Sequence, residues 1–368
     1  MDNETLFHEV MIGIGYRGRL DVPTQASSCD VMYNWAREFA NGKIEWARSK
    51  IPGLPPIHFD FIDSEEINAH AFSCDGKYFI GLCAGPLVAF NTLFLHLLAD
   101  KRVLRGIGNP DRESEKLPLL TLPIHVAQPR IYNNDRDIAP RDEERLAYAK
   151  HLRTIVFDYL LSHEIVHIAN GHVDYLGKEH GLTALPEAGQ TEIDPERRLD
   201  RQTIEMDADA IAGSWALSAI RKNLETKIES PLSRFYRTPA QALATWTFAI
   251  SAYFRVFGDS LLSEADYSTI THPPDRARQA MMMSMSAVYL MDHWDRALAE
   301  TTAIPINDAM LEVERAFALM TGEQPAIRGF LESWDACGAD CMNRLLAHWK
   351  TTLRAKLLPY AYHKDLAD

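Results

Sequence analysis

Residues 162–167 read Ser162-His163-Glu164-Ile165-Val166-His167, inside a segment whose apolar residues recur at steps of three and four. This spacing predicts a helix over residues 142–170, with both histidines on its buried stripe. Positions four apart lie on one face of a helix. His163 and His167 can therefore bind one Zn²⁺ while Glu164 faces its water.

A zinc ion on this helix would need a further ligand, because a catalytic zinc usually has three protein ligands and one open position. His172 is a poor candidate, since five residues after His167 it turns away from the shared helix face. The alternative to a metal site is a pair of core histidines whose ring nitrogens are satisfied by neighbouring carbonyls or carboxylates.

A second helix is predicted around residues 203–212, where acidic and apolar residues occupy different faces. Glu205 and Asp209 are one turn apart, and the apolar side consists of Ile204, Ala208, Ile211 and Ala212. We expect Glu205 to be the third ligand and Asp209 to accept the outer N–H of a ligating histidine. If Glu205 does not bind the metal, Asp207 and His172 are the next candidates. This ligand set is typical of a metalloprotease.

The pairing of His163-Glu164-x-x-His167 with Glu205-x-x-x-Asp209 resembles the gluzincin metallopeptidases of the HtpX and CaaX-prenyl endopeptidase type. The order and spacing over about residues 66–285 also resemble the soluble, Lit-like phage-exclusion peptidases. The resemblance implies a zincin-like α+β fold, with a small sheet packed on the active-site helix and a mostly helical C-terminal region. It also implies that the chain is a zinc-dependent endopeptidase acting on a protein substrate.

A late segment, from Thr271-His272-Pro273-Pro274 to Arg278, is similar to a motif of the same family. In that motif, a histidine and an arginine six residues later face the substrate or support the site. The resemblance implies that His272 or Arg278 stabilises the oxyanion. Alternatively, Arg278 pairs with an acid of the helix around Glu205, and His272 caps the proline turn.

Residues 67–72 resemble the strand that pairs with the substrate backbone in this family. The resemblance implies that Asn68, Ala69 and Phe72 bind the substrate, which would lie antiparallel to this edge. Pairing of this kind uses main-chain hydrogen bonds and carries little sequence information.

Composition limits the class of protein. The 368 residues suffice for one large domain or two modest ones, and an apolar content of 46% supports a full core. The net charge of −13 argues against nucleic acid or an anionic membrane as a partner.

The N-terminus has no signal-peptide pattern, and the apolar runs 80–99 and 243–254 are too interrupted or too short to span a membrane. We expect a globular cytoplasmic protein whose scattered cysteines are reduced: Cys29, Cys74, Cys83, Cys337 and Cys341.

Three regions are expected along the chain: residues 1–65, a zinc metallopeptidase core over 66–285, and a helical region over 286–368. Helical periodicity predicts helices over 31–50, 240–257, 274–294, 308–321 and 342–358. Strands are expected over 56–62, 78–83 and 119–127, with a turn at Gly85-Pro86 and then a buried helix. A linker over 177–195 should join the two metal-binding helices.

Two other functions are compatible with these motifs. The first is a zinc-binding regulatory or sensor protein that has the protease fold but no turnover. The second is a scaffold in which the histidines and acids form a metal-free buried network. Glu164 favours the enzyme, because a purely structural metal site needs no general base beside its ligands.

Overall fold

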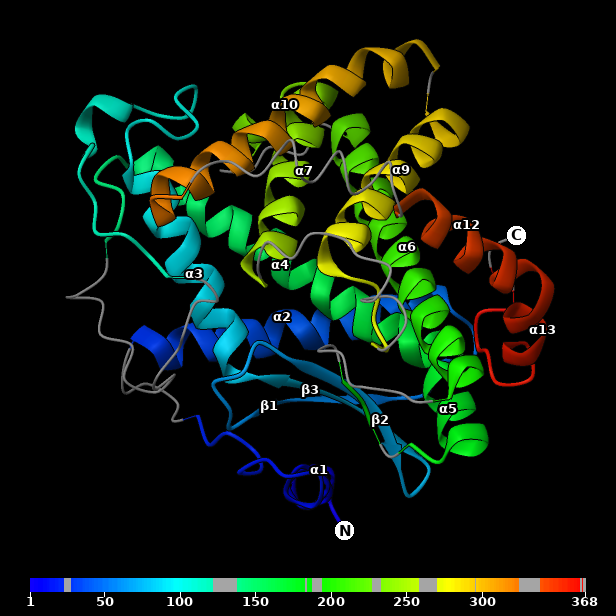
Figure 1. Cartoon of the computed structure of the whole chain (residues 1–368). Helices are drawn as coiled ribbons and strands as arrows, with labels where there is room; N and C mark the ends of the chain where they lie inside the picture. Colours follow the sequence, from blue (N-terminus) through cyan, green and yellow to red (C-terminus); the bar gives the residue numbers. More distant parts are fainter. Residues whose placement is uncertain are drawn as a thin grey trace.

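The computed structural model describes residues 1–22, 28–121, 138–182, 184–186, 194–226, 233–257, 270–294, 296–323, 338–364 and 366. A small sheet lies beneath a thick layer of helices (Figure 1). Its four strands are β1 (Ile57–Ile62), β2 (Ala69–Cys74), β3 (Lys77–Cys83) and β4 (Ala184–Pro186), in the order β1-β3-β2-β4. β1 and β3 are parallel, whereas β2 is antiparallel to both β3 and β4. The predicted α+β class is confirmed.

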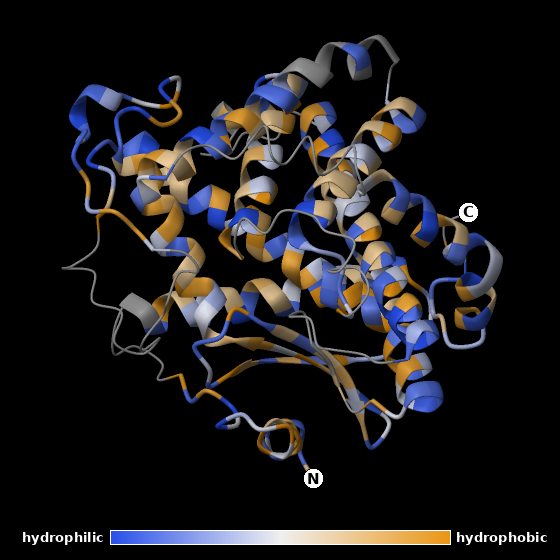
Figure 2. Ribbon diagram, in the orientation of Figure 1, coloured by the Kyte–Doolittle hydropathy of each residue, from blue (hydrophilic) through white to orange (hydrophobic). Residues whose placement is uncertain are grey.

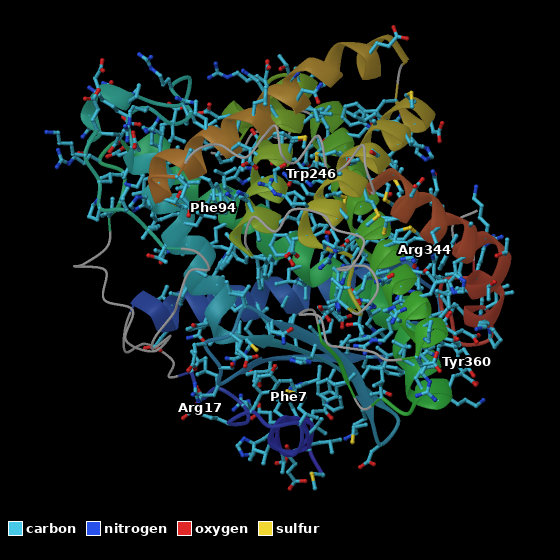
Figure 3. All side chains as sticks on the ribbon, in the orientation of Figure 1. Phe7, Arg17, Phe94, Trp246, Arg344 and Tyr360 are labelled. Carbon is cyan, nitrogen blue, oxygen red and sulfur yellow. The ribbon has the colours of Figure 1, made fainter. Side chains whose placement is uncertain are left out.

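The sheet is covered on both faces, because alternate residues of a strand point to opposite sides. Ile80 and Leu82 of β3 belong to the main core under the helices. Phe79 packs on the other side with Phe7 of α1 (Asn3–Gly13), which lies below the sheet in Figures 1 and 3. The strands therefore carry apolar residues at successive positions instead of a strict alternation.

The helical layer contains α2 (Ser28–Lys50), α3 (Ala84–Ala99), α4 (Glu143–Ala169), α6 (Pro195–Thr226), α7 (Pro239–Val256), α9 (Asp275–His293) and α10 (Arg296–Thr321). α4 packs against α2, α3, α6 and α7. Hydrophobic residues, orange in Figure 2, are concentrated in α3 and in the strands. α5 (His172–His180), α12 (Ala339–His348), the π-helical turn η6 (Trp349–Leu353) and α13 (Arg354–Leu357) share a separate small core with part of α6.

The predicted helices and strands agree with the structure where the signal is local. α4 begins where expected, because the Asp142 side chain accepts hydrogen bonds from the backbone N–H groups of Glu144 and Arg145. α2, α7 and α9 and strands β1 and β3 occupy their predicted ranges to within a few residues. None of the helices in the described part of the chain has the length and hydropathy needed to cross a membrane.

The predicted turn at Gly85-Pro86 is wrong, because both residues lie in the first turn of α3. Proline is tolerated there, since its missing N–H has no partner within the helix. Gly85 is required for another reason: a Cβ atom at this position would lie 2.1 Å from the carbonyl oxygen of Glu65. The chain therefore passes directly from β3 into a buried helix.

Other boundaries also differ from the predictions. α10 begins twelve residues before the predicted helix 308–321 and contains Pro305. The predicted helix 342–358 is divided into α12, η6 and α13. The range 177–195 begins inside α5 and contains β4. Residues 119–121 form no strand, and 122–127 lie outside the described residues, as does Cys337. Cys74, Cys83 and Cys341 are free thiols.

Candidate metal centre

The candidate ligands come from two helices that are distant in sequence and packed together. His163 and His167 lie in the last two turns of α4, and Glu205 lies in α6. α6 also approaches α9 closely, because a Cβ atom at Gly213 would lie 2.7 Å from the sulfur of Met282. Gly213 thus allows α9 to pack closely against α6.

Three donor atoms converge at the contact between α4 and α6. His163 Nε2 is 2.8 Å from His167 Nε2 and 3.2 Å from Glu205 Oε2. The other oxygen of Glu205 is 3.7 Å from His167 Nε2. The three side chains are buried, and their donor atoms lie within 4.8 Å of one another. Two imidazole nitrogens and a carboxylate oxygen aimed at one point form a group that can hold a metal ion.

The ionisation of these groups suits metal binding. Burial lowers the pKa of His167 well below its usual value, so its ring is neutral and can donate a lone pair. Burial alone would raise the pKa of Glu205, but His272, His167 and His163 outweigh it and lower that pKa well below its usual value. Glu205 is therefore a carboxylate despite being buried.

The outer nitrogen of the first histidine is held by an acid. His163 Nδ1 is 2.9 Å from Asp209 Oδ1. Asp209 accepts two hydrogen bonds from Arg278, both 2.8 Å long, and one of 2.6 Å from the hydroxyl of Tyr159. Burial would raise the pKa of Asp209, but Arg278 and His163 lower it below its usual value. Asp209 thus remains charged and fixes the orientation of the His163 ring.

The outer nitrogen of the second histidine is held by another histidine. His167 Nδ1 is 3.0 Å from His172 Nδ1, and His172 Nε2 is 3.2 Å from Asp207 Oδ2. Asn170 donates a hydrogen bond of 2.6 Å to the same oxygen of Asp207. His172 and Asp207 therefore support His167 and do not converge with Glu205.

The sequence prediction missed this support because it judged His172 as if the helix predicted over 142–170 continued past its end. The chain turns at Gly171, whose φ is 77°, and α5 then begins at His172. A Cβ atom at Gly171 would also lie 2.5 Å from the backbone carbon of Tyr360. The pair Asn170-Gly171 could have predicted this turn, since Asn-Gly commonly marks the end of a helix.

His272 also lies at the candidate metal centre. Its Nε2 is 3.3 Å from Glu205 Oε1, and its Nδ1 is 3.2 Å from the Thr271 hydroxyl. The N-cap residue of α9 is Pro274, which makes no capping hydrogen bond through its side chain. His272 thus faces the candidate ligands.

Arg278 pairs with an acid of the helix around Glu205, which was the alternative to a role in stabilising the oxyanion. Its guanidinium is buried, makes the bidentate contact with Asp209, and lies 5.3 Å from the centre of the Phe254 ring. A residue held in this way acts through Asp209 and His163. The structure gives no support for direct contact between Arg278 and a substrate.

The candidate metal centre is closed to solvent in this conformation. Glu164 is 2% exposed and His272 is 5% exposed. The edge of β2, at which a substrate was expected to pair, is occupied by β4, with Ala184 opposite Phe72 and Pro186 opposite His70. β4 runs antiparallel to β2, as was expected of the substrate.

The residues predicted to bind the substrate are buried as well. Ala69 and Phe72 have no exposed surface, and the Phe72 ring stacks on Phe79 with 5.0 Å between ring centres. Asn68 precedes β2, and its side-chain amide donates to the hydroxyl of Tyr16. In this conformation these side chains belong to the core, so only backbone atoms of β2 are suited to pairing.

Substituting Asp209 by asparagine is expected to weaken zinc binding by about 10- to 100-fold, because the amide is a poorer acceptor for the outer N–H of His163. Competition with a zinc-chelating dye measures this affinity. Asp292→Asn, at an exposed position of α9, is the control and should bind zinc as the parent does. Unchanged affinity in Asp209→Asn would mean that the contact does not help to hold the metal.

Substituting Arg278 by alanine is expected to lower the free energy of unfolding by about 3 kcal/mol, because the buried Asp209 loses its cationic partner. Urea denaturation measures the change, and Arg278→Lys should recover part of it. A stable Arg278→Ala protein whose peptidase activity alone is reduced would instead support the catalytic role implied by the family resemblance.

Comparison with known proteins agrees with the chemistry of this centre. No curated protein and no solved structure gives a significant match to the chain. The model of the family described as Peptidase U49 matches residues 118–295, a little under half of the chain. This range contains His163, His167, Glu205 and His272. Over it, the chain is similar to a family of peptidases, the Lit-like proteases.

Proposed function

We propose that this protein is a zinc-dependent endopeptidase with a zincin-like fold. His163, His167 and Glu205 hold the zinc ion, and Glu164 is the general base. The observation that carries the proposal is the convergence of three donor atoms, from His163, His167 and Glu205. The buried Glu164 follows His163 on the same turn of α4. The match of residues 118–295 to a peptidase family supports the same function.

A zinc ion held by these residues would supply a Lewis acid and would lower the pKa of the attacking water toward ~7. Glu164 takes a proton from the attacking water as the water oxygen bonds to the scissile carbonyl carbon. It then delivers that proton to the leaving amine as the C–N bond breaks. His272, whose Nε2 lies 3.3 Å from Glu205, donates a hydrogen bond to the developing oxyanion in this proposal, a contribution of about 3 kcal/mol.

The substrate is a protein or peptide segment in extended conformation. It pairs with the backbone of β2 near Asn68, Ala69 and Phe72, as the family resemblance implies. Because β4 pairs with residues 70–72 of the same edge, such a substrate has to take the place of β4. Productive binding thus requires a conformation more open than the present one.

A specific observation favours a second function, that of a zinc-binding regulatory or sensor protein without turnover. The candidate ligands and Glu164 are buried, and β4 covers the adjacent strand edge. In such a protein the zinc would have no open coordination position. A hydroxamate, which needs that position, would then fail to bind the zinc-loaded protein.

Comparison of newly formed protein N-termini in cells tests the peptidase directly. One culture expresses the parent protein, and the other expresses Glu164→Gln, which keeps the ligands but lacks the base. We expect a defined set of new N-termini only with the parent protein. Identical sets in both cultures, with full zinc content in both proteins, would favour the regulatory function.

A further inference from the structure

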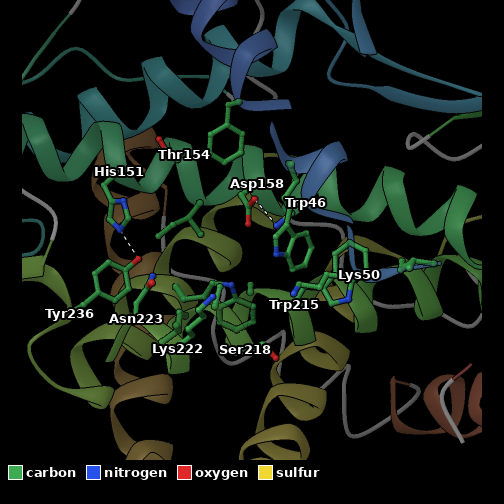
Figure 4. Close-up of a pocket in the computed structure, with 18 of the residues that line it drawn as sticks. Trp46, Lys50, His151, Thr154, Asp158, Trp215, Ser218, Lys222, Asn223 and Tyr236 are labelled. Atoms are coloured by element: carbon green, nitrogen blue, oxygen red, sulfur yellow. Dashed lines mark hydrogen bonds and ion pairs between the residues drawn. The ribbon is translucent and has the colours of Figure 1, made fainter. Parts of the chain in front are cut away.

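A cavity lies away from the candidate metal ligands, between α2, α4 and α6 (Figure 4). Its volume is about 680 Å³, within the range of roughly 300–1,000 Å³ that is common for small-molecule sites. None of the candidate zinc ligands lines this cavity. We call it the α2–α6 pocket.

The α2–α6 pocket is walled largely by aromatic and aliphatic side chains. Trp46 of α2 and Trp215 of α6 meet edge to face, with 5.2 Å between ring centres and 79° between ring planes. Further apolar lining residues are Phe39, Ile51, Ile155, Ile220 and Trp246. Aromatic walls of this kind bind the apolar body of a ligand by burying its surface.

The charges around the pocket are unbalanced in favour of lysine. Lys43 forms an ion pair of 2.8 Å with Asp158 and lies over the Trp46 ring. Lys50 and Lys222 also line the pocket and are exposed. Within the described ranges of the chain, neither of these two lysines forms an ion pair. In a chain of net charge −13, the pocket thus carries a local excess of positive charge, which favours an anion.

Two buried nitrogen atoms of the lining residues have no hydrogen-bond partner in the part of the chain that the structure describes. One is the indole nitrogen of Trp246, a residue only 2% exposed, and the other is Nδ1 of His151. The second ring nitrogen of His151 lies 2.6 Å from the hydroxyl of Tyr236, as drawn in Figure 4. The indole N–H of Trp246 is costly to leave without an acceptor, so a ligand that brought an acceptor within its reach would relieve this cost.

We propose that the α2–α6 pocket binds a small amphipathic anion. The apolar body lies against Trp46 and Trp215, and the anionic group lies near Lys50 and Lys222. The proposal goes beyond the peptidase function and does not depend on it, since no residue of the pocket is assigned to the zinc site.

Titration of the full-length protein with 8-anilinonaphthalene-1-sulfonate, whose fluorescence rises in apolar sites, tests the proposal. We expect one saturable site. Decanoate should displace the dye at a concentration at least about tenfold lower than decyltrimethylammonium does, because the two share an apolar chain and differ in the sign of charge. Equal displacement by the anion and the cation would overturn the assignment of ligand class.

Two variants locate the binding. In Lys50→Gln/Lys222→Gln, the Kd for decanoate should rise about five- to tenfold, since each exposed lysine contributes a modest attraction. The matched control is Lys116→Gln/Lys350→Gln, which removes two exposed lysines from outside the pocket and should leave the Kd unchanged. A Kd that rises equally in both double variants would show that only net charge matters.

Filling the pocket gives a test that does not involve charge. Ala219 lines the pocket and is exposed, so tryptophan can replace it without entering the core. Ala219→Trp should abolish dye binding at unchanged zinc content and melting temperature. Ala347→Trp, at an exposed position of α12, is the control and should bind the dye normally. Unchanged dye affinity in Ala219→Trp would place the site elsewhere and overturn the proposal.

Discussion

Alanine at His163 or at His167 is expected to remove most of the bound zinc and, with it, all measurable peptidase activity. Each substitution deletes one of the three donors that converge between α4 and α6. The two remaining donors hold zinc far more weakly, because affinity depends on the number of ligands. The parent protein should carry about one zinc per chain after dialysis, measured by plasma mass spectrometry.

The control for these zinc measurements is a histidine outside the candidate metal centre. His293, exposed near the end of α9, serves this purpose, and His293→Ala should keep its zinc. Glu205→Gln should lose zinc and activity together, because a neutral amide oxygen is a poorer ligand than a carboxylate. Full zinc occupancy in both His163→Ala and His167→Ala would exclude this group as the metal site.

Glutamine at Glu164 is expected to reduce peptide cleavage by about 10²- to 10⁴-fold while zinc content and melting temperature stay at the parent values. The substitution keeps the size of the side chain but removes the group that takes and returns the proton. Single-turnover cleavage of a peptide identified from the new N-termini measures the loss. The expected change is in kcat, with little change in KM.

Glu143→Gln is the matched control, because it places the same substitution at an exposed position of the same helix, α4. It should cleave as the parent does. If Glu164→Gln also cleaved at the parent rate, Glu164 would not be the base. A loss of zinc in Glu164→Gln would instead assign the residue to the metal shell.

Much of the fold and of the site is encoded locally and was predictable for that reason. The helix that carries His163 and His167 has a capping aspartate, a regular apolar stripe and a glycine just beyond its end. Glu205 and Asp209 share a helix face at a spacing that local geometry fixes. These signals need no knowledge of distant contacts.

The remaining features depend on contacts between distant parts of the chain. β4 has only three residues, and its partner β2 lies more than a hundred positions earlier. The sequence pattern therefore does not predict that these two strands pair. The pairing of Arg278 with Asp209 depends on how α9 packs against α6, which the spacing of the late motif does not specify. Only one alternative for Arg278, pairing with an acid of this helix, could be stated from the sequence.

The division of the ligands between α4 and α6 has a consequence for folding. His167 and Glu205 are 38 positions apart in sequence (205 − 167), so an ion bound by both would close a long loop of the chain. An ion held by these residues would bind the folded arrangement and have little affinity for the separated helices, so its binding energy would add to conformational stability. The melting temperature should therefore rise with the logarithm of free zinc, and a strong chelator should promote unfolding by mass action.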